Sequence, residues 1–164
     1  MNIYHIYSKQ SLVTVVALVL LPHCLFLDEN MGGYEKMKEK KIKVLKVEPG
    51  MNPVAVELTN KLEALQEAVS IGADYTGLIE IIELNEKICL LCNEEGKLIG
   101  LPGNRRVGSD IIPGTFYITG QDEDGNLTSL TAEQMWFYQI LFWEPETYTQ
   151  SEVEDSIQVT FIPI

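Results

Sequence analysis

The chain has 164 residues, of which 46% are hydrophobic and 22% are charged, and its formal net charge is −12. This length and composition predict a globular protein with one core and exclude a wholly disordered chain. The charge argues against nonspecific nucleic-acid binding and against adhesion to anionic membranes, because both need clustered lysine and arginine. A basic protein partner, or imitation of nucleic acid by surface carboxylates, remains compatible with it.

The first part of the chain is the most apolar. Residues 11–27 form a hydrophobic run that is short for a membrane span, which needs about 20 residues. Three interpretations stay open: a start assigned too far upstream, with translation beginning at Met37, a weak signal peptide or anchor, or a structured extension. The only histidines, His5 and His23, lie in this part. A protein that starts at Met37 therefore has no imidazole, the commonest general base and metal ligand.

The next segment predicts two strands and a helix. Residues 42–49 and 53–58 alternate apolar and polar side chains, as half-buried strands do. Residues 60–72 follow the helical period, and Asn60 followed by Glu63 predicts a capping box at the start of that helix. The apolar stripe of the helix consists of Leu62, Leu65, Ala68 and Val69.

The middle of the chain predicts strands joined by short turns. Residues 76–84 and 87–92 are apolar runs separated by a turn at Asn85 and Glu86. A glycine-containing hairpin connection at 93–97 then leads to a further strand at 98–102.

A turn of Pro102, Gly103 and Asn104 follows, with two arginines beside it. Residues 110–120 predict a strand that a bulge or edge feature interrupts at Pro113 and Gly114. Residues 121–126, with three acidic side chains, predict an exposed turn.

Residues 129–143 predict the second helix, and its start carries the clearest local signal in the chain. Thr131 and Gln134 match a capping box, and Leu130 can pack on Met135 as a hydrophobic staple. Between 135 and 143 only Gln139 is polar, so the helix must be covered on more than one side. The cover comes from the chain's own tail or N-terminal segment, or from a second copy or another protein. The candidate interface residues are Met135, Trp136, Tyr138, Phe142 and Trp143.

The strands cluster along the chain instead of alternating with helices, which is typical of an α+β fold. We expect a mainly antiparallel sheet of about five to seven strands with two helices packed against it. The chain then divides into a doubtful leader at 1–36, a single domain at 37–145, and an acidic linker with a possible C-terminal strand at 146–164. Within that last part, the linker covers 146–156 and the strand 157–164.

Cys89 and Cys92 form a C-x-x-C motif inside an apolar strand. Side chains three apart in a strand point to opposite faces, so the two thiols cannot share one metal ion. We expect two buried thiols that act as small hydrophobic side chains. No metal site and no cofactor is predicted.

Four motifs together resemble a known bacterial family. They are "KVLKVEPG", "CNEEGKLIGLPGNR", "DIIPGTFYITG" and "SLTAEQ", in this order and with compatible spacing. Over about residues 42–145 the chain resembles the domain of unknown function 3846 family (DUF3846). The resemblance implies a small cytoplasmic accessory protein of a phage, plasmid or conjugative element, in some cases one that counters host defence. It implies no activity and no catalytic residue.

The loop with the two arginines is the first candidate site. Guanidinium groups beside a turn can bind a phosphate or carboxylate in a bidentate way. The alternative is that both arginines pair with Asp110 and nearby glutamates and are incidental to function. The candidate ligand-binding residues are Asn93, Glu94, Asn104, Arg105, Arg106, Asp110, Thr115 and Tyr117.

Two further hypotheses rest on carboxylates. Acidic segments at 121–126 and 152–156, with the acidic face of the first predicted helix, could imitate the phosphates of DNA, or could only keep the protein soluble. Glu80, Glu83 and Asp110 could form a catalytic carboxylate pair, but nothing in their spacing selects them.

The hypothesis that we favour is a cytoplasmic, non-enzymatic accessory protein of a mobile element. It acts by binding a host protein, or forms a homo-oligomer, through the helix at 131–143. The alternatives are a binder of a small anionic, nucleotide-like ligand at Arg105 and Arg106, and an acidic DNA mimic. Direct nucleic-acid binding is not expected, and membrane association or export is expected only if the leader is genuine.

Overall fold

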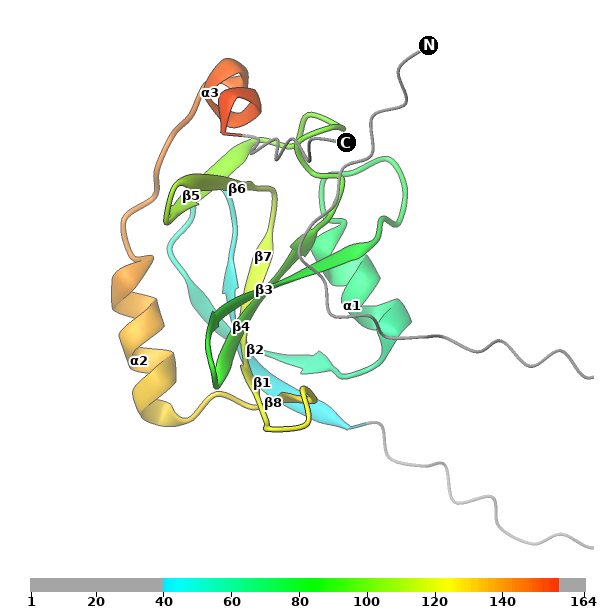
Figure 1. Cartoon of the computed structure of the whole chain (residues 1–164), viewed down its shortest axis with the longest axis vertical. Helices are drawn as coiled ribbons and strands as arrows, with labels where there is room; N and C mark the ends of the chain where they lie inside the picture. Colours follow the sequence, from blue (N-terminus) through cyan, green and yellow to red (C-terminus); the bar gives the residue numbers. More distant parts are fainter. Residues whose placement is uncertain (1–39, 157–164) are drawn as a thin grey trace, which may run out of the picture. The chain divides into compact units, whose positions relative to one another are not determined.

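The computed structural model describes residues 40–156 (Figure 1). The side chains of its first strand lie on two faces. β1 (Lys41–Val47) buries Ile42 and Val44 on one face and Leu45 and Val47 on the other. A strand with apolar side chains on both faces belongs in the interior of a sheet that is covered on both sides. β1 accordingly has a strand partner along each of its two edges.

The sheet has six strands in the order β2-β1-β7-β4-β3, and β8 pairs with β7 beside this path. Every one of these pairings is antiparallel. The prediction of an α+β fold with a mainly antiparallel sheet is therefore confirmed. Beyond β1, the strands of this sheet are β2 (Val54–Thr59), β3 (Ile79–Asn85), β4 (Ile88–Asn93), β7 (Phe116–Gln121) and β8 (Leu127–Thr128).

Two helices lie on opposite sides of this sheet (Figure 1). α1 (Leu62–Val69) buries Leu65 and Val69 in one apolar cluster, and α2 (Ala132–Leu141), together with the residue after it, buries Tyr138 and Phe142 in the other. Cys89 belongs to the cluster under α1 and Cys92 to the cluster under α2. The prediction that the two thiols are buried on opposite faces is confirmed.

The second sheet is a hairpin of β5 (Gly103–Val107) and β6 (Asp110–Pro113). Sequence reasoning placed a strand at 98–102 and the arginines in the loop after it, and both placements are wrong. Residues 94–100 form successive turns, closed by a hydrogen bond of 2.9 Å from the Leu101 N–H to the Gly96 carbonyl. Because these turns occupy most of the segment that was expected to pair, the strand begins at Gly103, five residues later than predicted.

The break at Pro113 and Gly114 is not a bulge within one strand. The chain leaves the hairpin there and enters the large sheet as β7. Gly114 has a φ of +68°, which other residues rarely adopt, and its N–H donates to the Pro102 carbonyl at 2.8 Å. Because of this turn, β6 and β7 belong to different sheets although they are consecutive in the chain.

The two predicted capping boxes have different outcomes. Thr131 and Gln134 bond each other's main chain as predicted, with N–O distances of 2.8 and 3.2 Å. The box at Asn60 and Glu63 is wrong, because α1 begins one residue later and has no side-chain cap. Asn60 instead donates its amide to the Leu127 carbonyl at 3.2 Å.

The acidic segment after α2 was expected to be a linker, but part of it is helical. α3 (Gln150–Asp155) has a capping box of Thr149 and Glu152, buries Val153 and packs against β6. The described part of the chain thus has three helices where two were expected. The leader at 1–36 and the predicted strand at 157–164 lie outside the described residues.

Candidate functional site

Arg105 lies inside the protein. The register between β5 and β6 shifts between Gly103 and Arg105, so Asn104 is the extra residue of a bulge and both Asn104 and Arg105 point inward. The Arg105 side chain is 0% exposed and donates to the carbonyls of Met51 (2.8 Å) and Phe142 (3.1 Å). It also donates to the main-chain and side-chain oxygens of Asn104, at 3.1 and 2.9 Å.

These bonds join three separate segments. Arg105 links β5 to the segment after β1 and to the C-terminal end of α2, while Asn104 donates to the carbonyls of Val47 (2.9 Å) and Gly114 (2.7 Å). Burial lowers the pKa of Arg105, and the carboxylates of Glu146 and Glu144 oppose that shift. The Arg105 guanidinium is therefore engaged with the protein itself.

Arg106 points the other way because it is the next residue in the strand. Its side chain is exposed and lies over the Tyr148 ring, 5.6 Å from the ring centroid. Its main-chain N–H donates to Glu146 Oε2 at 3.3 Å. Asp110 does not pair with either arginine, since its carboxylate accepts from Lys97 Nζ and from the Ile111 N–H. The acidic partner predicted for the arginines is thus held by another cation.

The other predicted ligand-binding residues do not gather around the arginines. Asn93, Thr115 and Tyr117 are buried, whereas Glu94 is exposed. Tyr117 belongs to the cluster under α1, on the face of the sheet opposite the one from which Arg105 bonds Phe142. Burial, helped by the charge of Glu48, raises the pKa of Tyr117 to about 12. The structure therefore divides the predicted group between the two faces.

The thiols and the carboxylates Glu80 and Glu83 are similarly separated. Glu80 pairs with Cys92 across the strands and Glu83 pairs with Cys89, so these two glutamates lie on opposite faces. Burial raises the pKa of Glu80, and the charges of Asp110 and Glu94 add to this shift. Burial also raises the pKa of Cys89 to about 11 and that of Cys92 still further. Neither thiol is activated as a nucleophile.

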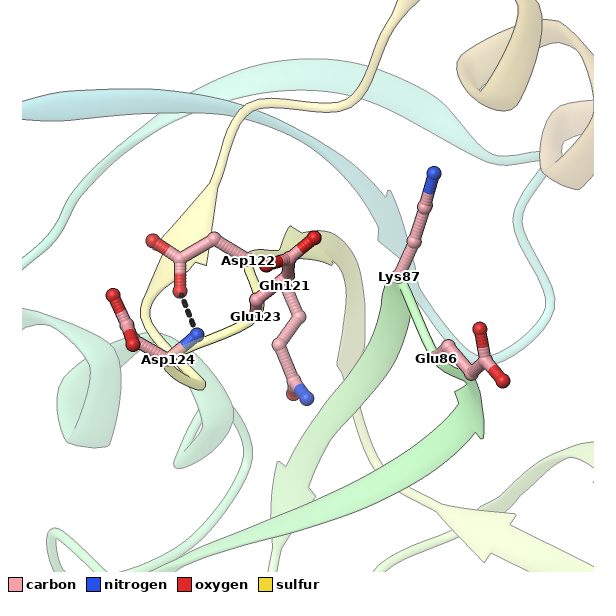
Figure 2. Close-up of a pocket in the computed structure, with 6 residues that line it drawn as sticks. All are labelled: Glu86, Lys87, Gln121, Asp122, Glu123 and Asp124. Carbon is pink, nitrogen blue, oxygen red and sulfur yellow. Dashed lines mark hydrogen bonds between the residues drawn. The ribbon is translucent and has the colours of Figure 1, made fainter.

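A shallow depression of about 480 Å³ lies between the β3–β4 and β7–β8 turns (Figure 2). Asp122, in the predicted acidic turn, accepts from the main-chain N–H groups of Asp124 (3.0 Å) and Asn126 (2.8 Å). Through these hydrogen bonds the Asp122 carboxylate stabilises the turn. Within residues 40–156, no three acidic, cysteine or histidine side chains are arranged to hold a metal ion. The residues that line the depression are Glu86, Lys87, Gln121, Asp122, Glu123 and Asp124.

The most unusual surface is the outer side of α2. Trp136 is 65% exposed and Leu141 58%, although both are large apolar residues. The inward side of the same helix holds the core contacts of Tyr138, Phe142 and Met135. We call the outer side of α2, together with Trp143 just after the helix, the aromatic face. It consists of Trp136, Phe137, Ile140, Leu141 and Trp143, which are all about half exposed or more.

A neighbouring segment continues this surface. Asn52 Nδ2 donates to the Trp143 carbonyl at 2.7 Å, and Gln139 Nε2 donates to the Pro53 carbonyl at 3.4 Å. These bonds hold the segment between β1 and β2 against α2. Met51 in that segment and Val54 at the start of β2 are also exposed. The aromatic face is therefore part of a wider apolar surface.

Sequence reasoning found part of this surface. Of the five candidate interface residues, Trp136 and Trp143 are on the aromatic face, whereas Met135, Tyr138 and Phe142 face the core. It missed Phe137, Ile140 and Leu141. The signal was available, because a staple that turns Met135 inward also turns the residues half a turn away outward.

No helix within residues 40–156 has the length and apolar character that crossing a membrane requires. No curated protein and no solved structure matches the chain. One family model does match, that of a domain of unknown function (DUF3846), over residues 42–142. The matched residues include the whole six-stranded sheet from Ile42 of β1 onward, the β5–β6 hairpin, α1 and α2. Because this match covers more than half of the chain, the protein belongs to the DUF3846 family.

Proposed function

We propose that this protein is a cytoplasmic, non-enzymatic accessory protein of a phage or other bacterial mobile element, and that it acts by binding a host protein through the aromatic face. The observation that carries the proposal is the exposure of five large apolar side chains on one side of α2. Together they present on the order of 500 Å² of surface, the size of the largest apolar patch on a typical monomer.

The size of this surface suits the centre of a protein interface. A stable interface buries about 800 Å² on each partner, so the aromatic face needs a surrounding polar contact zone. The segment from Met51 to Val54 offers part of that zone through its main chain and Asn52. Tryptophan is also among the residues that contribute most to binding energy when buried at an interface.

Two features favour a different protein over a second copy, and binding over catalysis. Two copies would each bring a net charge of −12 to the contact, and this repulsion opposes self-association. No histidine follows residue 36, and burial keeps the thiols of Cys89 and Cys92 protonated near neutral pH. The family resemblance supports the mobile-element setting.

Site-specific crosslinking tests the proposal. A photo-crosslinking residue at position 140 should capture one defined protein in the natural host, and Trp136→Ala should reduce the capture at least tenfold. The matched control is position 62, because Leu62 is exposed to a similar degree (61%) but lies on α1. Equal capture from positions 62 and 140, or crosslinking only to a second copy, would contradict the proposal.

The acidic depression of Figure 2 supports a second candidate function, imitation of nucleic acid. Four of its six lining residues are carboxylates. A DNA mimic would compete with DNA for a nuclease or other DNA-binding protein, and this competition should weaken steeply with salt. Asp122→Asn with Glu123→Gln should abolish it, whereas Trp136→Ala should not.

A further inference from the structure

The outer face of the β5–β6 hairpin is covered separately from the two faces of the large sheet. Arg106 pairs with Ile111 across the two strands, so both side chains lie on the face away from Arg105 and Ile112. Ile112 belongs to the cluster under α2, but Ile111, only 1% exposed, belongs to neither core cluster. Because α3 packs against β6, we assign the burial of Ile111 to residues 144–156, which we call the strap.

The strap fits this face closely. Val153 is 0% exposed, and a Cβ added to Gly103 would lie 2.8 Å from Val153 Cγ2 and 2.9 Å from Tyr148 Cβ. Tyr148 stacks on the Arg106 guanidinium and donates its hydroxyl to Glu146, which accepts from the Arg106 N–H. The surface made by Gly103, Arg106 and Ile111, which we call the seat, thus holds an aliphatic, an aromatic and an acidic side chain.

Among residues 40–156, few contacts hold the strap. α3 has six residues, and Val153 is its only buried side chain. A helix this short is unstable without tertiary contacts. The polar contacts at the two ends are long, 3.3 Å from the Arg106 N–H to Glu146 and 3.4 Å from Lys97 Nζ to the Ser156 carbonyl. We expect a segment held in this way to open locally more readily than the sheet.

The seat and the strap also differ in their relation to the family. All three seat residues lie within the matched residues 42–142, whereas the whole strap lies beyond them. The strap is rich in carboxylates, and the seat presents the cationic side chain of Arg106. Lys97, which is paired with Asp110, donates to the last carbonyl of the strap.

We propose that the seat is a peptide-binding surface for an acidic segment of a partner protein, and that the strap occupies it in cis. The segment carries a tyrosine or similar aromatic residue over Arg106, an acidic residue two positions earlier, and a valine or isoleucine five positions later against Gly103. This surface is separate from the aromatic face and does not depend on the function proposed for it.

A competition experiment with the full chain tests the proposal. The probe is a fluorescent peptide of the strap sequence, EPETYTQSEVEDS, and its binding is followed by polarisation. Val153→Asp should displace the strap and strengthen peptide binding at least tenfold over the unchanged protein, because a tethered competitor acts at an effective concentration on the order of millimolar. Gly103→Ala added to Val153→Asp should abolish binding, and so should Tyr→Ala in the peptide.

Three results would overturn the proposal. The first is a folded Val153→Asp protein, judged by circular dichroism, that binds the peptide no better than the unchanged chain. The second, which needs no variant, is hydrogen exchange in which the strap amides are as protected as those of β4 and β7. The third is a doubled mass of the unchanged chain, lost with Val153→Asp, which would assign the seat to the strap of a second copy.

Discussion

The two adjacent arginines illustrate how position in a strand decides the role of a side chain. Arg105 is enclosed and bonds three main-chain carbonyls and one amide oxygen, whereas Arg106 stacks on Tyr148 at the surface. A buried guanidinium is tolerated only when its donors are satisfied, so the carbonyls of Met51 and Phe142 are part of the same unit. Arg105 therefore connects β5 to the surface around α2.

Replacing Arg105 should destabilise the protein strongly. Arg105→Ala leaves several buried carbonyls without a donor and should lower the free energy of unfolding by about 3 kcal/mol or more. Arg105→Lys should rescue little, because an ammonium group cannot reproduce the planar arrangement of donors. Urea unfolding provides the measurement. Arg106→Ala is the matched control and should cost less than about 1 kcal/mol; similar losses for both variants would contradict this assignment.

The buried thiol of Cys89 predicts a loss of stability at high pH. Its pKa is raised from the ordinary value of 9.0 to about 11, so the folded state favours the protonated form. The stabilisation is complete below pH 9 and is lost between pH 9 and 11, by up to about 1.4 kcal/mol per pH unit. Cys92, whose pKa burial raises still further, contributes over the same range, so Cys89→Ala should reduce the slope and Cys89→Ala with Cys92→Ala should remove it between pH 9 and 10, below the range in which Tyr117 contributes. An unchanged slope in the double variant would contradict this assignment.

At the scale of elements, α2 combines a well-defined start with two apolar sides. Its capping box is local and could be read from four residues. Its apolar composition, by contrast, did not indicate which side faces the sheet. The inward side is chosen by contacts of Phe142 with Phe116, whose rings lie 5.5 Å apart edge to face, and of Tyr138 with Asn85.

The cap of α2 should contribute measurably to stability. Thr131→Ala removes the side-chain acceptor for the Gln134 N–H and should lower the free energy of unfolding by about 1 kcal/mol. Thr131→Ser keeps the hydroxyl and is expected to stay close to the original protein. Thermal unfolding of the two variants side by side would check this, and an equal loss in both would show that the methyl group matters instead.

The two sides of α2 should respond differently to substitution. Phe142→Ala opens a cavity in the cluster under α2 and should cost about 3–5 kcal/mol. Ile140→Glu changes only an exposed position and should alter stability by less than about 0.5 kcal/mol. Denaturant unfolding measures both. A large loss for Ile140→Glu would mean that the aromatic face is covered within the chain.

For the whole molecule, an acidic surface and an exposed aromatic face act in opposition. The net charge of −12 opposes contact between copies, while the exposed apolar side chains of the aromatic face favour association. These two effects should set how readily the protein associates with itself.

Salt should reveal this balance. Screening shortens the range of charge repulsion from about 10 Å at 0.1 M to about 3 Å at 1 M. We therefore expect light scattering to show a monomer at low ionic strength and a rising mass at high ionic strength. Ile140→Glu should remain monomeric throughout. A stable dimer at low salt, unchanged by Ile140→Glu, would contradict this account of the surface.

The sequence alone determined the features that depend on near neighbours in the chain. Alternation places the thiols of Cys89 and Cys92 on opposite faces, and four residues specify the cap of α2, because both follow from the geometry of one strand or one turn. Clustered strand patterns were likewise enough to predict the antiparallel sheet. Tertiary structure decided the rest: a bulge at Asn104 turned Arg105 inward, Asn60 bonded β8 instead of capping α1, and an acidic tail became the strap. Each of these features depends on contacts with residues dozens of positions away in the chain, and a local sequence pattern does not specify such contacts.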